Sequence, residues 1–145
     1  MELIYQLPIS FAASAAFGLI FDVPRNKLVH CGTVGMIGWL IYSIAIALGL
    51  DPIPATFIAA LIVASISQMF SKLYRTPIIN FSVVGIIPLV PGGLAYDAMR
   101  NFVGNQYDLG MQLSVKALLI SGAIAIGLVF SEVVYQVARR KIRQG

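Results

Sequence analysis

Two prolines and two adjacent glycines interrupt the apolar run Ile78–Met99, at Pro88, Pro91, Gly92 and Gly93. Proline removes a backbone donor and clashes with the preceding helical turn, and glycine also disfavours helix. We therefore expect a helix to break here and to restart with free N–H groups at the positive end of its dipole. Such an end attracts carboxylates, and secondary transporters often build midplane sites from interrupted helices.

Polar side chains close to the break extend this hypothesis. Tyr96 and Asp97 follow within about one helical turn, and Asp97 is the nearest candidate for binding a proton or a cation. Lys116 begins the last apolar run, where it either snorkels to the interface or pairs with an anionic substrate. The alternative for the whole motif is a proline kink that only shapes packing. The predicted substrate-binding residues are Pro88, Pro91, Gly92, Gly93, Tyr96, Asp97 and Lys116.

The elements that position these residues must lie in a membrane. Of the 145 residues 59% are hydrophobic and only 11% are charged, and the mean hydropathy is +0.88. Soluble domains are about 45–50% apolar and about 25% charged. We predict an all-α polytopic membrane protein with one transmembrane domain over residues 1–145. Apolar runs of sufficient length predict five spans, with the fourth one broken, at about 3–21, 28–50, 53–71, 78–99 and 113–137.

The basic residues predict the orientation of these spans. Eight of the ten Lys and Arg fall in alternate connectors and in the tail, Arg100 lies on the other side, and Lys116 lies beside a span. Positive charge marks the cytoplasmic side, so the N-terminus is expected outside and the C-terminus inside. The basic tail is interpreted as an anchor that meets anionic lipid rather than nucleic acid. Whether the fourth segment spans or turns back is left open.

Small residues at helical spacing predict how the spans pack. They let helix backbones approach closely in lipid, where no hydrophobic force drives association. Such stripes are typical of helix–helix contacts rather than ligand sites. They comprise Gly32, Gly35 and Gly38 in the second span, and Ala60, Ala64, Ser67 and Ser71 in the third.

Residues for enzyme chemistry are few. The chain has one histidine and one cysteine, no nucleophile elbow, no phosphate-binding loop and no metal-spaced cluster. We expect no cofactor, no metal and no enzymatic activity, with an intramembrane enzyme as the weakest alternative. His30 is expected to serve interfacial packing, and Glu132 to pair with a basic residue of the tail.

Three segments of the chain resemble the threonine/serine exporter family. They are FDVP at Phe21–Pro24, CGTVGMIGW in the second span, and IIPLVPGGLAYDAM at Ile86–Met99. The resemblance is to the carboxy-terminal membrane domain of that family, which in many bacteria is a separate small subunit. The most specific match is the P-x-x-P-G motif and the following tyrosine, at Pro88, Pro91, Gly92 and Tyr96. Phe21, Val23 and Pro24 match a second, moderately specific motif.

The resemblance implies export of small metabolites across the bacterial inner membrane. Fused members of the family are implicated in export of threonine and serine, and the split pair in export of succinate and related dicarboxylates. It implies a larger membrane subunit as partner, which also fits a broken helix that must not face lipid. The alternatives are a structural scaffold subunit without a substrate site and a channel formed by a homo-oligomer. The residues do not choose between amino acids and dicarboxylates.

Overall fold

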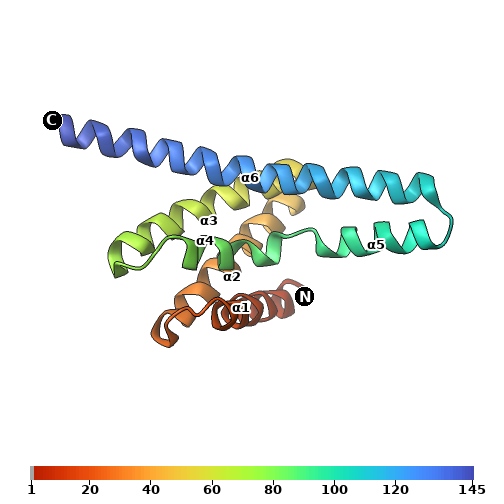
Figure 1. Ribbon diagram of the computed structural model, residues 1–145, viewed down its shortest axis with the longest axis horizontal. Helices are drawn as coiled ribbons and strands as arrows, with labels where there is room; N and C mark the ends of the chain where they lie inside the picture. The colour runs from red at the N-terminus through yellow and green to blue at the C-terminus, as the bar shows by residue number, and fades with distance from the viewer. Residues whose placement is uncertain (1) are drawn as a thin grey trace.

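The computed structural model describes residues 2–145, and within this range the chain forms helices joined by short turns (Figure 1). Four helices are long and apolar enough to cross a membrane, and one bent pair would make a fifth span. This agrees with the predicted all-helical membrane protein, and the predicted number of five spans is reached if the bent pair is one span. The helices are α1 (Glu2–Ile20), α2 (Leu28–Ala47), α3 (Pro52–Tyr74), α4 (Ile79–Ile86), α5 (Gly92–Val103) and α6 (Tyr107–Gln144), with the 3-10 turns η1 (Arg25–Lys27) and η2 (Ile87–Leu89).

The bounds of α3 follow from its terminal residues. It begins at Pro52, a residue suited to the first helical position because its missing N–H would be unpaired there anyway. It ends before Arg75, which takes the left-handed conformation with φ 51° and donates its N–H to the carbonyl of Ser71. Pro77 then prevents the helix from resuming at once. This sharp stop turns the chain back into α4.

The core lies where α2, α3, η2 and α6 meet. Small side chains dominate the contact surfaces, as the two predicted stripes required. A Cβ atom added at Gly38 would lie 2.6 Å from Cγ2 of Val63, and one at Gly32 would lie 2.6 Å from the ring of Phe11. The glycine stripe of α2 is therefore confirmed as a helix–helix contact. In the α3 stripe Ala60 packs against α6, because a Cβ atom added at Gly127 would lie 3.1 Å from the Cβ of Ala60. The main buried cluster comprises Val34, Ala59, Ala60, Val63, Leu89, Ile120 and Ile124.

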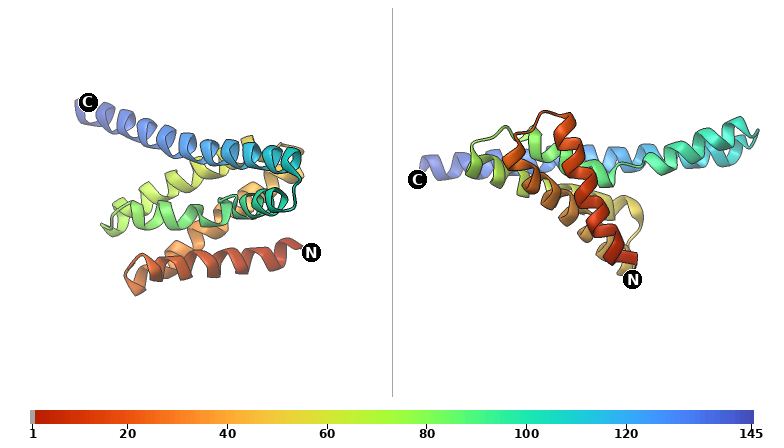
Figure 2. Two further views of the ribbon diagram at one scale, coloured as in Figure 1. Left: turned by 45° about the vertical axis from the view of Figure 1, so that its right-hand side comes forward. Right: turned by 90° about the horizontal axis from the view of Figure 1, so that it is seen from below.

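Helices α3 and α6 run parallel to each other. The ring of Phe57 lies 6.5 Å from that of Phe130, and further along both helices Gln68 donates to Glu132 at 3.1 Å. In both contacts a later residue of α3 meets a later residue of α6. The C-terminal ends of the two helices therefore lie at the same end of the bundle (Figures 1 and 2). The segment α4–η2–α5 therefore carries the chain from that end to the other.

Most of the basic residues lie at one end of the molecule. The α1–α2 connector, the α3–α4 connector and the C-terminus point the same way, and the N-terminus lies at the opposite end (Figure 1). The first two are in contact, because Nζ of Lys27 is 3.9 Å from the centroid of the Tyr74 ring. The eight Lys and Arg residues that the sequence assigns to one side of the membrane thus lie at one end of the folded chain.

The last connector is shorter than the sequence predicted. The expected spans ended at Met99 and resumed at residue 113, whereas α5 continues to Val103 and α6 already begins at Tyr107. Arg100, assigned to a connector, therefore lies in the last turn of α5. Apolar runs mark where a helix lies in lipid, but its backbone hydrogen bonds continue through polar residues beyond the bilayer. The α5–α6 hairpin extends away from the bundle of α1–α4 (Figure 2).

Candidate functional site

The Pro/Gly segment interrupts the helix between α4 and α5. After α4 the chain makes the single turn η2, becomes extended at Val90 (ψ 129°), and starts α5 at Gly92. An extended residue is expected directly before Pro91, because the proline ring disfavours the helical conformation there. The two helical pieces are inclined by 50°.

The first turn of α5 presents backbone donors. Gly92 donates locally to the carbonyl of Val90 at 2.8 Å, and among residues 2–145 no side chain caps this helix. No carbonyl of α5 itself can accept from the N–H groups of Gly93 and Leu94, which belong to the first turn. These donors and the dipole of a 12-residue helix give this point a partial positive charge.

A hollow of about 240 Å³, here called the central hollow, lies beside this first turn. It is smaller than the roughly 300–1,000 Å³ of drug-sized ligand sites, which suits a small metabolite. Residues from α2, α3 and α6 close it on the other sides. Its lining comprises Trp39, Tyr42, Thr56, Pro88, Leu89, Val90, Pro91, Gly93, Leu94 and Ile120.

Three side chains bring polar atoms to the lining of the central hollow. The rings of Trp39 and Tyr42 pack with their centroids 5.3 Å apart. The indole of Trp39 donates to Oε1 of Gln6 at 3.1 Å, which fixes the ring against α1. The hydroxyl of Thr56 donates to the carbonyl of Pro52 at 2.6 Å, so its lone pairs remain free to accept. The hollow thus combines backbone donors, an aromatic wall and a hydroxyl acceptor.

A second hollow, of about 480 Å³, lies between α5 and α6 and is here called the α5–α6 hollow. Gly92 lines it, together with mainly apolar residues of the two helices. Its hydroxyls already donate within their own helix, Ser114 to Gly110 at 2.8 Å and Ser121 to Ala117 at 2.9 Å. The N–H of Gly92 already donates to the carbonyl of Val90 at 2.8 Å, so this hollow lacks the free backbone donors that line the central hollow.

Comparison of the sequence with known protein families gives one match. The family described as Threonine/Serine exporter, ThrE, matches residues 6–134, which is most of the chain. The chain belongs to the threonine/serine exporter family. No solved structure matches it. Membership supports an exporter role and a transporter rather than an enzyme.

The predicted site residues of this exporter-family chain divide into two groups. Pro88, Pro91 and Gly93 line the central hollow, and Gly92 lines the α5–α6 hollow. Tyr96 is 69% exposed on the outward face of α5.

Asp97 and Lys116 do not line either of these two hollows. Asp97, in the middle of α5, lines a separate hollow with Arg100 near the α5–α6 turn. Lys116 is exposed on the third turn of α6, away from both hollows. Within this chain the structure therefore does not bring Tyr96, Asp97 or Lys116 to the central hollow.

Sequence reasoning missed Trp39, Tyr42 and Thr56. A signal was present, because Trp39 is the only tryptophan and lies in the interior of a predicted span. Tryptophan and tyrosine gather at membrane interfaces. An aromatic pair with polar atoms three residues apart at mid-span therefore indicates a polar partner inside the protein.

Neither glycine at the start of α5 is required by the packing of this chain. Both have ordinary backbone angles, and a Cβ atom at Gly92 or Gly93 would meet nothing within 4 Å. In contrast, the glycines of α2 are each in contact with a neighbouring helix. The space in front of Gly92 and Gly93 is therefore open to a ligand or to another chain.

Two further polar predictions have different outcomes. The ring of His30 hydrogen-bonds to the hydroxyl of Tyr74 at 2.9 Å and packs against its ring, in agreement with a packing role. Glu132 does not pair with a basic residue of the tail as expected. Its two oxygens accept from the amides of Gln68, at 3.1 Å, and Gln136, at 2.9 Å. The basic tail residues lie beyond it because α6 continues straight to Gln144.

Proposed function

We propose that this chain is the small membrane subunit of a two-component exporter of small carboxylate metabolites in the bacterial inner membrane. One observation carries the proposal: the uncapped first turn of α5, at Gly93 and Leu94, lines a metabolite-sized hollow within the helix bundle. A carboxylate matches that end of a helix in charge and in hydrogen bonding. Exporter-family membership supports transport as the purpose of such binding.

The donors of Gly93 and Leu94 hold one carboxylate in this proposal. The hollow contains neither an acidic nor a basic side chain among its lining residues. The ammonium of threonine or serine would therefore donate to the hydroxyl of Thr56, which only accepts because its hydrogen is bonded to Pro52. The other carboxylate of succinate would instead meet a donor of the partner subunit. Both substrate classes remain in the proposal, and transport measurements decide between them.

A larger partner subunit covers the broken segment in this proposal. Irregular backbone within the bilayer must face protein or water, because unpaired N–H and C=O groups are costly in lipid. In this chain Val90 is 50% exposed and Tyr96 is 69% exposed. Tyr96, Asp97 and Arg100 follow the exposed face of α5 at helical spacing, which gives the partner a surface with an aromatic ring, a carboxylate and a guanidinium.

The fourth segment spans the membrane once in this proposal, and the basic end is cytoplasmic. The parallel course of α3 and α6 supports a single crossing by α4–η2–α5, because a re-entrant segment would return the chain to the end it left. Eight basic residues at one end support the orientation with the N-terminus outside and the C-terminus inside.

The test is efflux of labelled succinate and labelled threonine from cells that carry this chain alone, the larger partner alone, or both. We expect export only when both are present, and the exported label identifies the substrate class. Export by this chain alone would overturn the two-component proposal in favour of a homo-oligomeric channel. Export by the partner alone would make this chain a scaffold. Consumption of the label without export would indicate an enzyme.

A further inference from the structure

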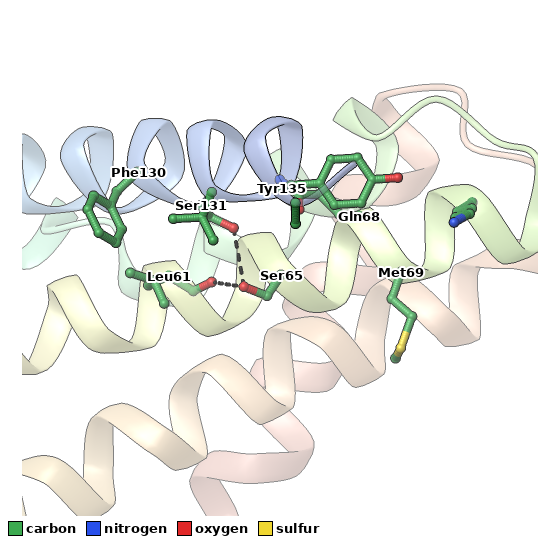
Figure 3. A pocket seen from close by; sticks show the side chains of 10 residues that line it. Leu61, Ser65, Gln68, Met69, Phe130, Ser131 and Tyr135 are labelled. Atoms are coloured by element: carbon green, nitrogen blue, oxygen red, sulfur yellow. Dashed lines mark hydrogen bonds between the residues drawn. The ribbon is translucent and has the colours of Figure 1, made fainter. Parts of the chain in front are cut away.

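The C-terminal halves of α3 and α6 form a second feature that the exporter proposal does not use. The two parallel helices are in contact at Ser65 and Ser131, whose hydroxyls are 3.2 Å apart (Figure 3). They are also in contact at Gln68 and Glu132. Beyond these contacts the helices separate toward the basic end (Figure 1). Two neighbouring hollows occupy the space that opens between them.

The first, the basic hollow, measures about 380 Å³ and is lined by Lys72, Arg75 and Arg139. It also contains one carboxylate, that of Glu132, so its formal charge is three minus one, or +2. Both oxygens of Glu132 accept hydrogen bonds from neutral amides rather than from these cations. The three cations are therefore available to an anion from outside the chain.

The second, the apolar groove, measures about 440 Å³ and runs along the same two helices (Figure 3). Leu61, Met69, Phe130 and Val134 line it. Met69 is 59% exposed and Phe130 is 54% exposed, although both are large and hydrophobic. The groove thus presents apolar side chains toward the bilayer.

The two hollows adjoin each other. Gln68, Lys72 and Tyr135 belong to the lining of both. A ligand that fills them needs an anionic head at the basic end of the bundle and a long apolar tail that runs into the membrane. Succinate and other soluble anions could use the cations but leave the groove empty.

We propose that one anionic phospholipid molecule binds between α3 and α6. Its phosphate lies among Lys72, Arg75 and Arg139, and one acyl chain lies along the groove past Phe130. This site differs from the attraction of the basic tail to the membrane surface, because it requires three particular cations beside a groove. It is independent of the central hollow and of the proposed export.

The site can be tested by tryptophan fluorescence, with the single tryptophan moved into the groove. Trp39→Phe removes the native indole, and Phe130→Trp places an indole in the groove. The full chain is reconstituted in phosphatidylcholine, and part of the lipid is replaced by brominated phosphatidylglycerol or, as the neutral comparison, by brominated phosphatidylcholine. Bromine quenches only an indole in contact with it. We expect stronger quenching by phosphatidylglycerol at equal lipid fraction.

Variants then distinguish a specific lipid-binding site from general electrostatic attraction to the anionic membrane surface. One cation near an anionic membrane contributes about 1 kcal/mol, or about fivefold in binding. Replacing Lys72, Arg75 and Arg139 together with Gln should therefore remove a preference of about a hundredfold. The matched control replaces Arg140, Lys141 and Arg143 with Gln, which removes the same charge from outside the hollow. It should keep the preference.

Three results would overturn the proposal. Equal quenching by the two lipids would mean that no anionic site exists. An equal loss in the control variant would mean diffuse attraction to the surface only. If added succinate relieved the quenching, the basic hollow would bind a soluble anion rather than a lipid.

If the triple variant does not fold, Arg139→Gln alone, on the exposed end of α6, should lower the preference for phosphatidylglycerol about fivefold.

Discussion

Gly93→Leu places a large apolar side chain at the edge of the central hollow, where the substrate carboxylate is proposed to bind, without disturbing the chain around it. The Cβ atom at this position would meet nothing within 4 Å, and the residue lines the hollow. Leucine also favours helix over glycine by up to about 1 kcal/mol. The substitution therefore should not weaken α5, and any loss of transport would come from the obstructed site.

The size of the loss follows from the interactions that the substrate would forfeit. A hydrogen bond to a charged group contributes about 1.5–3 kcal/mol, and the end of a helix contributes about 0.3–1 kcal/mol toward an anion. Losing one such bond together with the dipole costs about 2–4 kcal/mol. At about 1.4 kcal/mol for each factor of ten, export at low internal substrate should fall by about 30- to 700-fold.

Gly92→Leu is the matched control. It makes the same chemical change one residue earlier, also in open space, but lines the α5–α6 hollow. The assay is initial efflux of labelled succinate or threonine from cells that express the variant with its partner, normalised to the amount of complex in the membrane. Unchanged efflux by Gly93→Leu, or an equal loss in both variants, would refute the assignment of the central hollow as the substrate site.

The remaining predictions concern packing, orientation and binding. Gly38→Ala should lower the stability of the helix bundle by about 1–3 kcal/mol, because its Cβ would lie 2.6 Å from Val63. Gly122→Ala, which meets nothing within 4 Å, should leave stability unchanged or raise it by up to about 1 kcal/mol. Thermal unfolding in detergent compares the two, and equal losses would contradict the packing described. A reporter fused after Gly145 should be active in the cytoplasm, and activity on the outer side would reverse the orientation. The fluorescence of Trp39 in the purified chain should change on addition of a transported carboxylate, and an unchanged spectrum would place binding elsewhere.

The sequence predicted the helices well because lipid imposes simple rules. Length, hydropathy and charge located α1, α2 and α3 within a few residues, and the glycine stripe around Gly35 identified the face that α2 buries. The break at Pro88–Gly93 was also predictable, because proline and glycine act on the local backbone. The ends of α5 and α6 were not, since their last turns are polar and extend beyond the apolar runs.

The site was predicted only where it depends on local backbone. Pro88, Pro91 and Gly93 do line a hollow, but the predicted companions on α5 lie on its outward face. The residues opposite the break, such as Trp39 and Thr56, come from helices that are distant in sequence. Their positions next to the break depend on the close packing of α2 and α3 through small residues. This packing cannot be predicted from any single segment of the sequence. Proximity along the chain was therefore a poor guide to proximity in the bundle.

Helix α6 gives the chain a rigid lever. Its 38 residues, at 1.5 Å each, make a rod about 57 Å long, against about 30 Å for the bilayer core. The same rod forms the hairpin with α5 at one end and carries the basic residues at the other. A force on the basic end would therefore tilt α5 rather than be absorbed by a flexible linker. A bulky cargo joined directly to Gly145 is then a mechanical load on the proposed export site, and a flexible spacer would remove it.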